Sequence, residues 1–568
     1  MGYGSVALHP GMRSVAQMAA GAGTSQRIFL NQVGYLPGAA KRATVRSAGA
    51  GEFVVRSMSD HGVADRRIAM KGKLGAVVHD DASGDAVRVA DFSELRDGRY
   101  RVEAEGGASD AFSVGPLVYA EALRMAMRGY YGQRCGCAVD LGGGYRHPAC
   151  HRVGAFHATS GKSGPLVNHG GWHDAGDYGR YVVNSGLSTG TLLWAWEIYP
   201  RALRSLALGI PESGGKVPDY LAEVRWNLEW MLSLQDGDGG VWHKQTSEHF
   251  CAFIMPQDDA LTSYVIGTGA APYKSTCATG DLAAVMAIAA RCYGPYDPAF
   301  AQRCLSASRR AWTWAVRHPD VIFHNPPSIS TGDYGDEHCG DEIAWASAEL
   351  WRTTGESQYE KAFLAAMPAG GAELTITEPD WGNVISMACW TYALADRAGD
   401  AVTKGRIREA TLKAADLLKV RHSSSGYGNT LAMTDYVWGS NGTAGNRSLL
   451  LWMANHFHGD AAGRDAALGN LHYILGRNCH GVSWVTHLGA RPFEHPHHRP
   501  SAADGIAAPW PGLLSGGPNA HGGDAVADKL PKQPPMRMWL DDQRAYSLNE
   551  IAINWNAPLV FLLAAANS

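Results

Sequence analysis

The spacing of hydrophobic residues changes once along the chain, near Pro116. Between Ile28 and Pro116, short runs such as IFLNQVGYL, KRATVRS and GRYRVEAEG alternate apolar and polar positions and are separated by Gly and Asp turns. Alternation with a period of two is typical of strands that bury one face. We therefore predict a small β-sandwich over residues 28–116.

After Pro116 the hydrophobic period becomes helical. Twelve candidate helices fall around residues 119–131, 186–198, 218–235, 281–293, 299–316, 342–353, 357–366, 383–397, 405–419, 445–457, 463–476 and 548–566. An even set of antiparallel helix pairs can close into a ring whose inner helices are apolar all round. The predicted class is therefore mainly α for residues 117–568. The connections at 132–185, 236–280, 317–341 and 477–547 are long and rich in His and Gly, as functional loops often are.

Composition narrows the possible partners. The net charge is −4 without a long run of one sign, which gives no support to nucleic-acid or membrane-surface binding. No apolar stretch is long enough to cross a membrane. Residues 1–27 form a small, polar N-terminal segment that lacks the apolar centre of an export signal. The 18 Trp and 22 Tyr suit the flat faces of sugars as well as protein cores.

The first candidate site is the segment from Gly171 to Tyr178, which contains Asp174 and Asp177. Two carboxylates three residues apart in a Gly-rich loop can face one cleft, where their mutual repulsion and hydrogen bonds decide which one activates water. The alternative for an isolated Asp-x-x-Asp is an Asx turn or a helix cap. The pair alone does not decide between these interpretations.

The second candidate is Glu550, at the entrance of the apolar segment IAINWNAPLVFLLAAA. Partial burial there should raise the pKa of its carboxyl and keep a proton available near neutral pH. Asn549 and Glu550 also suit the start of a helix, so capping is the alternative.

A third candidate follows Ser483, where His497 and Arg499 alternate on a segment held extended by Pro496 and Pro500. Alternation places both side chains on one side, where they can donate hydrogen bonds to sugar hydroxyls. A metal site is the alternative for this His-rich run, and sugar binding is favoured.

Two further groups suit metal ions. Cys135 and Cys150, with His151, His173 and the nearby His169, could supply a closed tetrahedral zinc site bracing the loop of Asp174; buried thiols with surface histidines are the alternative. An acidic loop from Thr331 to Glu342, with Asp380 further on, suits Ca²⁺ or is simply solvated. The remaining Cys, such as Cys292, Cys304 and Cys389, are expected to be free buried thiols rather than a disulfide framework.

Taken together, these segments resemble glycoside hydrolase family 9, in the subgroup with an N-terminal immunoglobulin-like domain. The resemblance runs from about Ile28 to the end of the chain and rests on NQVGYLP at 31–37, on 172–177, and on the long segments 483–499 and 539–557. It implies an (α/α)6 barrel preceded by an immunoglobulin-like β-sandwich. It places the general base on Asp177, its water-positioning partner on Asp174 and the general acid on Glu550.

The same resemblance assigns supporting roles. It implies that His497, Arg499 and Tyr546 line the sugar site and that Trp438 is an aromatic platform for a sugar ring. Asp541 matches an acidic position with a supporting role. The resemblance also implies structural zinc at Cys135, Cys150, His151 and His173, and calcium at Asp341, Glu342 and Asp380. No cofactor is expected in the chemistry.

The predicted function is inverting hydrolysis of β-1,4-glucosidic bonds in cellulose, related glucans or cello-oligosaccharides, with a carboxyl separation of roughly 6.5–9.5 Å between Asp177 and Glu550. Exo-acting hydrolysis of cello-oligosaccharides or glucosamine chains is the nearest alternative. A non-catalytic carbohydrate-binding protein and a zinc hydrolase are the alternatives of other classes. We expect a monomer that binds a β-linked oligo- or polysaccharide. The expected location is secreted or periplasmic, and the cytoplasm is the alternative.

Overall fold

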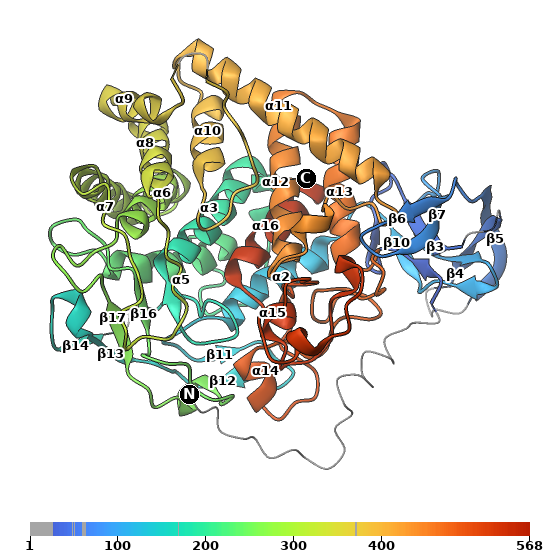
Figure 1. Ribbon diagram of the computed structural model, residues 1–568, viewed down its shortest axis with the longest axis horizontal. Helices are drawn as coiled ribbons and strands as arrows, with labels where there is room; N and C mark the ends of the chain where they lie inside the picture. The colour runs from blue at the N-terminus through green and yellow to red at the C-terminus, as the bar shows by residue number, and fades with distance from the viewer. Residues whose placement is uncertain (1–25, 48, 50, 60–63, 168–169, 370–371) are drawn as a thin grey trace.

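The computed structural model describes residues 26–47, 49, 51–59, 64–167, 170–369 and 372–568. Nearly all of the predicted N-terminal segment 1–27 lies outside this part. A small β-domain stands beside a much larger helical body (Figure 1), so the predicted class, mainly α with an N-terminal β-sandwich, is confirmed. None of the described helices combines the length and the apolar composition that a membrane span requires.

The β-domain consists of two sheets packed over one apolar core. Its strands are β1 (Ile28–Phe29), β2 (Gly34–Tyr35), β3 (Arg42–Arg46), β4 (Glu52–Met58), β5 (Ala64–Lys73), β6 (Val78–Asp80), β7 (Asp85–Asp91), β8 (Gly98–Ala104), β9 (Gly107–Ala108) and β10 (Phe112–Val114). The sheet orders are β1-β3-β7-β6 and β2-β10-β8-β4-β5, with β9 paired to β8. The buried ring of Tyr35 meets Phe92 and Phe112 edge-on at 5.5 and 5.4 Å, which fixes the two sheets against each other.

The helical body contains twelve long helices in its described residues, at the positions that the hydrophobic period predicts. They are α2 (Ala120–Gly132), α3 (Val182–Ile198), α5 (Asp219–Ser233), α6 (Thr276–Tyr293), α7 (Pro298–Arg317), α8 (Gly340–Thr354), α9 (Ser357–Ala366), α10 (Ile385–Leu394), α11 (Ala401–Ser424), α12 (Ser440–Phe457), α13 (Ala461–Ile474) and α16 (Ile553–Ala566). Short helical turns are α4 (Pro200–Leu203), α14 (Arg499–Ala503) and α15 (Tyr546–Asn549).

Inner and outer helices alternate along the chain. The inner helices α3, α6, α10 and α16 are buried along almost their whole length, whereas α7 and α11 bury only one stripe of residues. Helix α3 packs between α16 and α6, and α6 in turn packs on α8. This arrangement is the predicted ring of helix pairs, because a helix that is apolar all round must be covered on every side.

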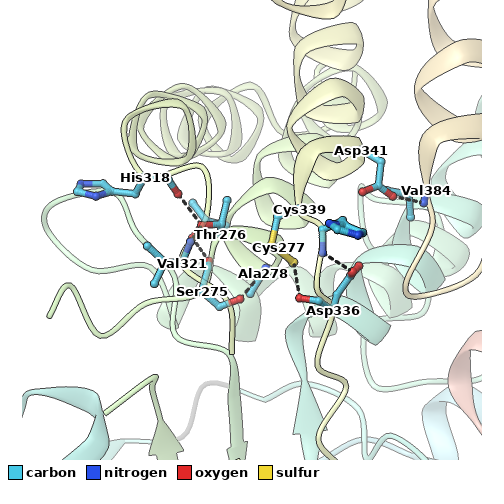
Figure 2. The surroundings of a disulfide bond; sticks show 12 residues. Ser275, Thr276, Cys277, Ala278, His318, Val321, Asp336, Cys339, Asp341 and Val384 are labelled. Carbon is cyan, nitrogen blue, oxygen red and sulfur yellow. Dashed lines mark hydrogen bonds between the residues drawn. A yellow bond between two sulfur atoms is a disulfide. The ribbon is translucent and has the colours of Figure 1, made fainter. Parts of the chain in front are cut away.

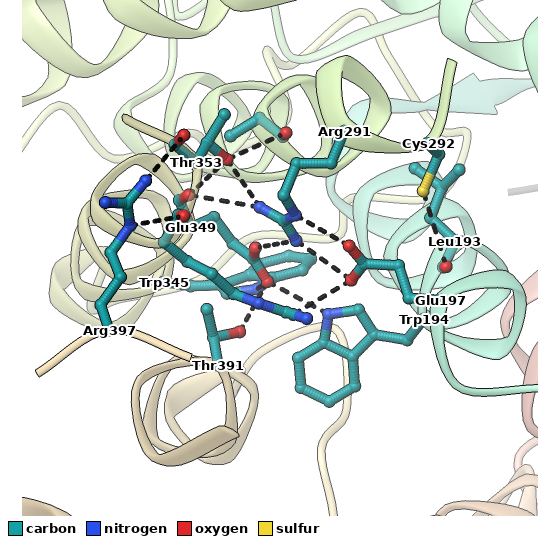
Figure 3. Close-up of polar contacts among 12 residues, drawn as sticks. Leu193, Trp194, Glu197, Arg291, Cys292, Trp345, Glu349, Thr353, Thr391 and Arg397 are labelled. Atoms are coloured by element: carbon teal, nitrogen blue, oxygen red, sulfur yellow. Dashed lines mark hydrogen bonds and ion pairs between the residues drawn. The ribbon is translucent and has the colours of Figure 1, made fainter. Parts of the chain in front are cut away.

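Near the C-terminal ends of three inner helices, buried charges tie the ring together (Figure 3). Arg291 of α6 donates to Glu197 of α3 at 2.8 Å and to Glu349 of α8 at 2.6 Å. The Glu349 side chain is fully buried and also accepts from Trp194 at 3.1 Å and Thr391 at 2.6 Å. Each buried charge thus has an opposite charge and hydrogen bonds, which is the condition under which such groups are tolerated.

The long connections contain a sheet that the hydrophobic pattern does not predict. Five short strands pair in the order β14-β13-β17-β16-β15: β13 (Val153–Phe156), β14 (Pro165–Val167), β15 (Arg180–Tyr181), β16 (Lys244–Thr246) and β17 (Ser263–Ile266). A separate pair joins β11 (Val139–Asp140) to β12 (Arg146–His147). Strands of two to four residues show no measurable period, which is why they escape a sequence-based search.

The β-domain is fastened to the barrel by buried polar contacts. Asn31 Nδ2 lies 2.9 Å from His472 Nδ1 on α13 and donates to the Tyr119 hydroxyl over 3.0 Å. The backbone N–H of Gln32 donates to Leu475 O over 2.9 Å. These contacts join the two parts of the molecule. They give the buried polar groups the hydrogen bonds that water would otherwise provide.

Candidate active site

The loop that carries Asp174 and Asp177 is fixed by its own backbone and by two neighbouring segments. Asp174 N–H donates to Gly179 O over 2.9 Å, and Gln133 Nε2 donates to the carbonyls of His173 and Ala175 over 3.1 and 2.9 Å. An added Cβ on Gly176 would stand 1.9 Å from the carbonyl oxygen of His497. The glycine therefore lets the base loop touch the His497 segment directly.

Asp174 is buried and accepts two side-chain hydrogen bonds. Asn184 Nδ2 donates to Oδ1 over 2.5 Å, and the Tyr334 hydroxyl donates to Oδ2 over 2.6 Å. Burial and the neighbouring charge of Asp177 raise the pKa of Asp174 to about 7, against the opposing effect of both hydrogen bonds. The orientation of this carboxylate is fixed, and its charge changes near neutral pH.

Asp177 is held on one of its two oxygens. Gly179 N–H donates to Oδ2 over 2.9 Å, and the hydroxyl of Tyr181, at the end of β15, donates to the same oxygen over 3.3 Å. Within the described part of the chain, no donor reaches Oδ1. Asp177 thus keeps one oxygen able to accept a proton from water, as a general base must.

Glu550 lies where the predicted helix over 548–566 is interrupted. The N–H of Gly516 donates to Glu550 O over 2.7 Å, and the N–H of Ile553 donates to Asp174 O over 2.9 Å. Backbone groups that would continue a helix instead bond to the loops, so α16 begins only at Ile553. The alternative that Asn549 and Glu550 start this helix is therefore wrong.

The environment of Glu550 favours its protonated form. Burial raises the pKa of its carboxyl well above the usual range, and the charges of Asp177 and Asp174 act in the same direction, opposed by Arg499. The base loop and the acid segment are joined directly through the bond between Ile553 and Asp174. The structure thus brings the three predicted carboxyl groups together.

The predicted sugar-binding residues lie beside Glu550. His497 pairs with Glu550 in a short parallel bridge and donates from Nδ1 to Gln543 O over 2.8 Å. Burial lowers the pKa of His497 to about 4, so the imidazole is neutral. Its ring lies 5.6 Å from Tyr546, which lies 5.4 Å from the half-exposed ring of Trp438. These rings form a row that ends in an exposed indole.

Arg499 and Asp541 make backbone contacts. The Arg499 guanidinium is almost fully buried and donates to Gly176 O over 2.8 Å and to Cys251 O over 3.0 Å. It therefore fastens the base loop, and the segment is no longer extended at this point because α14 begins at Arg499. Asp541 accepts from the N–H groups of Glu494 and His495 over 2.8 and 2.9 Å. These bonds fix the backbone just before His497.

The four predicted zinc ligands converge. One ligand atom from each of Cys135, Cys150, His151 and His173 lies within 4.8 Å of the others. His151 Nε2 lies 3.2 Å from Asp259 Oδ2, the carboxylate partner that a metal-binding imidazole commonly has on its second nitrogen. His169 lies outside the described residues. Two thiols and two imidazoles at this spacing fit a tetrahedral zinc ion, whose ligand bonds are about 2.0–2.3 Å long.

A second group of possible ligands surrounds the start of α8 (Figure 2). Carboxylate oxygens of Asp336, Asp341 and Glu342 lie within 4.8 Å of one another. Glu342 is fully buried, and no donor in the described residues reaches either of its carboxylate oxygens. The predicted Asp380 is not in this group but neighbours it; burial raises its pKa, and the charge of Asp336 adds to the effect. A cluster of carboxylate oxygens that contains a buried Glu342 without a hydrogen-bond donor in the described residues fits a hard cation such as Ca²⁺.

The same region contains a disulfide that the sequence does not indicate. Cys277 of α6 and Cys339, just before α8, are bonded to each other (Figure 2). The expectation of free thiols is confirmed for Cys292, Cys304 and Cys389 but is wrong for this pair. The two cysteines are 62 residues apart in sequence, and only the packing of α6 against α8 brings them together.

Three side chains of the site escape sequence reasoning, namely Asn184, Tyr334 and Tyr181. Tyr334 lies in the loop from Thr331 to Glu342, which the sequence marks as acidic but not as a contact of Asp174. Asn184 and Tyr181 flank the start of an apolar helix, and their polar groups turn toward the carboxylates. No spacing in the sequence distinguishes them.

Carboxyl groups that converge on the loops of a helical barrel are consistent with a glycoside hydrolase. The model of glycosyl hydrolase family 9 matches residues 119–563, and that of the cellulase N-terminal ig-like domain matches residues 23–109. The chain belongs to glycosyl hydrolase family 9.

Similar proteins span nearly the whole chain. Endoglucanase D of Acetivibrio thermocellus is 35% identical over 95% of this chain and 83% of its own length. The cellodextrinase of Butyrivibrio fibrisolvens is 33% identical over 95% of this chain and 99% of its own. The crystal structure of a Zn-binding triple mutant of the family 9 endoglucanase J30 superposes with a TM-score of 0.87 at 35% identity, covering 94% of this chain and 99% of that chain.

Proposed function

We propose that this glycoside hydrolase cleaves β-1,4-glucosidic bonds with inversion, using Glu550 as general acid and Asp177 as general base. The observation that carries the proposal is the convergence of a buried, proton-holding Glu550 with the Asp174 and Asp177 pair on two loops that bond to each other. Inversion requires room for one water between acid and base, so we expect their carboxyl groups to lie roughly 6.5–9.5 Å apart.

Each residue has a defined task in this mechanism. Glu550 gives its proton to the glycosidic oxygen while Asp177 Oδ1 takes a proton from water that attacks the anomeric carbon from the opposite face. Asp174 orients that water, and the neutral His497 donates a hydrogen bond to a sugar hydroxyl. Tyr546 and Trp438 offer apolar ring faces to neighbouring sugars.

The residue assignment is tested by Asp177→Asn, which keeps the shape of the side chain and removes its basicity. We expect turnover to fall by about 10²–10⁴-fold, the usual contribution of general base catalysis, with an unchanged circular dichroism spectrum. Proton NMR of the first products from the active enzyme should show the α-anomer. A variant that retains most of its activity, or initial release of the β-anomer, contradicts the proposal.

The preferred substrate is proposed to be a glucan or a cello-oligosaccharide. The endoglucanase relative supports internal attack on a glucan, and the cellodextrinase relative supports action on cello-oligosaccharides. Chain-end action on glucosamine chains is the other alternative on this fold. Product patterns from soluble cellulose, cellohexaose and chitosan oligomers separate these possibilities. If the substrate is a polymer, we propose that the enzyme acts outside the cytoplasmic membrane.

We further propose that zinc and calcium have structural roles. Cys135, Cys150, His151 and His173 would hold zinc in a closed site with no open position for water, which argues against zinc hydrolysis. Asp336, Asp341 and Glu342 would hold calcium. A catalytically inactive carbohydrate-binding protein is disfavoured because all three carboxyl groups of the site are present and converge.

A further inference from the structure

Lys244 is a buried cation behind the catalytic base. It begins β16, which pairs with β15 and places Lys244 opposite Tyr181. The side chain is fully buried, and Nζ donates to Asn325 Oδ1 over 2.6 Å, to Thr331 Oγ1 over 3.2 Å and to Gly332 O over 2.6 Å. Three acceptors match the three donors of an ammonium group, whereas a neutral amine could satisfy only two.

Gly332 and Tyr181 link this ammonium to Asp177 by successive contacts. Nζ donates to the carbonyl of Gly332, and the N–H of Gly332 donates to the Tyr181 hydroxyl over 3.2 Å. That hydroxyl donates to Asp177 Oδ2 over 3.3 Å. Nζ also lies 5.5 Å from the centre of the Tyr181 ring. Lys244 therefore holds Gly332 in place, and Gly332 holds the Tyr181 hydroxyl that bonds to the base.

A structural role does not explain this lysine well. Burying a cation is costly unless a carboxylate pairs with it, and no carboxylate of the described residues forms a salt bridge with Lys244. Burial lowers the pKa of Lys244 to about 7, and the charges of Asp333 and Asp177 oppose this effect. Below that pH the ammonium is charged, and the nearby negative charges offset part of its burial cost.

The other groups that face Asp177 make a positive charge useful. The charge of Asp177 raises the pKa of both Asp174 and Glu550, so acidic groups crowd one another in this site. His497 faces the same carboxylate and is neutral above its pKa of about 4. Two cations face these groups: Arg499, whose charge lowers the pKa of Glu550, and Lys244, whose own pKa the charge of Asp177 raises.

We propose that Lys244 is a positioning residue that orients Asp177 through Gly332 and Tyr181 and supplies a positive charge to the acidic groups of the site. The inference rests on the proposed function, because it assumes that Asp177 is the base. Its role is electrostatic, so its removal changes the pH dependence of the reaction rather than only the amount of folded enzyme.

The test is the pH profile of kcat/KM for Lys244→Met, which keeps the length of the side chain and removes the charge. Without the cation, the carboxyl groups of the site lose a charge that favours their ionised forms, so the acid limb should move to higher pH by about one unit, the lower end of the effect of a nearby opposite charge. The ammonium of the unmodified enzyme is charged below its pKa of about 7, so the comparison is made on the part of the limb below that pH. Lys244→Arg, which keeps a cation, should leave the limb close to its original position.

The matched control is Lys274→Met. Lys274 is also almost fully buried, but its Nζ pairs with Asp236 over 2.7 Å. We expect this variant to lose stability with an unshifted acid limb. If Lys244→Met does not fold, Lys244→Gln, which keeps hydrogen-bonding groups without the charge, serves for the same comparison.

An unshifted acid limb in a folded, uncharged Lys244 variant overturns the inference, as does an equal shift in the Lys274 control. These outcomes differ from a failure of the proposed function. If Asp177→Asn is inactive and the Lys244 variants show no shift, only the role of Lys244 is wrong. If Asp177→Asn remains active, the assignment of the base is wrong.

Discussion

Replacing Tyr334 by phenylalanine removes one hydrogen-bond donor from Asp174 and should shift the pH at which the enzyme becomes active to a higher value. The hydroxyl donates to Asp174 Oδ2 over 2.6 Å, and the ring that remains packs at 4.7 Å from Tyr181 and 5.3 Å from Trp381. A hydrogen bond to a charged group contributes about 1.5–3 kcal/mol. Because this bond favours the ionised carboxylate, its loss raises the pKa of Asp174 further above its usual range.

The size of the effect follows from the pKa of Asp174, which burial and Asp177 raise to about 7. A loss of about 2 kcal/mol corresponds to about 1.5 pKa units at 1.36 kcal/mol per unit. At pH 7 the ionised fraction of Asp174 then falls from about one half to about 3%, an approximately 15-fold loss if water must be oriented by the carboxylate. Above about pH 9.5 the two enzymes should differ by little more than about 10%.

The assay is kcat/KM on a soluble cello-oligosaccharide across the pH range, expressed as the ratio of variant to unmodified enzyme. Tyr220→Phe is the control, because it removes a buried hydroxyl that donates to the Leu192 carbonyl over 2.8 Å, within the helical ring. A ratio for Tyr334→Phe that is the same at every pH would refute the argument, since it would show that the hydroxyl does not act through the charge of Asp174.

Three further outcomes are expected. Arg291→Met leaves Glu349 buried without its cation and should lower the free energy of unfolding by about 3–5 kcal/mol in urea denaturation, whereas Arg124→Met, in an exposed pair, should cost less than about 1 kcal/mol. Replacing Cys277 and Cys339 by alanine opens a loop of 62 residues and should cost about 4 kcal/mol in the chain-entropy model; an unchanged midpoint would contradict this. Removing zinc with a chelator should lower the melting temperature before activity is lost, and activity that disappears while the fold persists would argue for a zinc hydrolase.

The sequence predicts the helical body well because each helix buries either one apolar stripe or its whole surface. The apolar residues that do so recur with the helical period within the segment itself. The segments around 218–235 and 357–366 agree with α5 and α9 within two residues at each end. The sequence also predicts the three carboxyl groups and the four possible zinc ligands that the structure brings together. Their identification depends on residue types in long loops and on the resemblance of segments 172–177, 483–499 and 539–557 to a known family.

Tertiary structure alone decides how these groups are held. The break at Glu550 arises because the N–H of Ile553 bonds to Asp174 O, a partner almost 400 residues earlier in the sequence. Tyr334 reaches Asp174 from a separate loop, Lys244 reaches the Gly332 carbonyl from a strand, and the Cys277–Cys339 bond requires α6 to pack on α8. A sequence specifies local periodicity directly, but the contacts that set charge and orientation at the site form only when distant segments have been packed together.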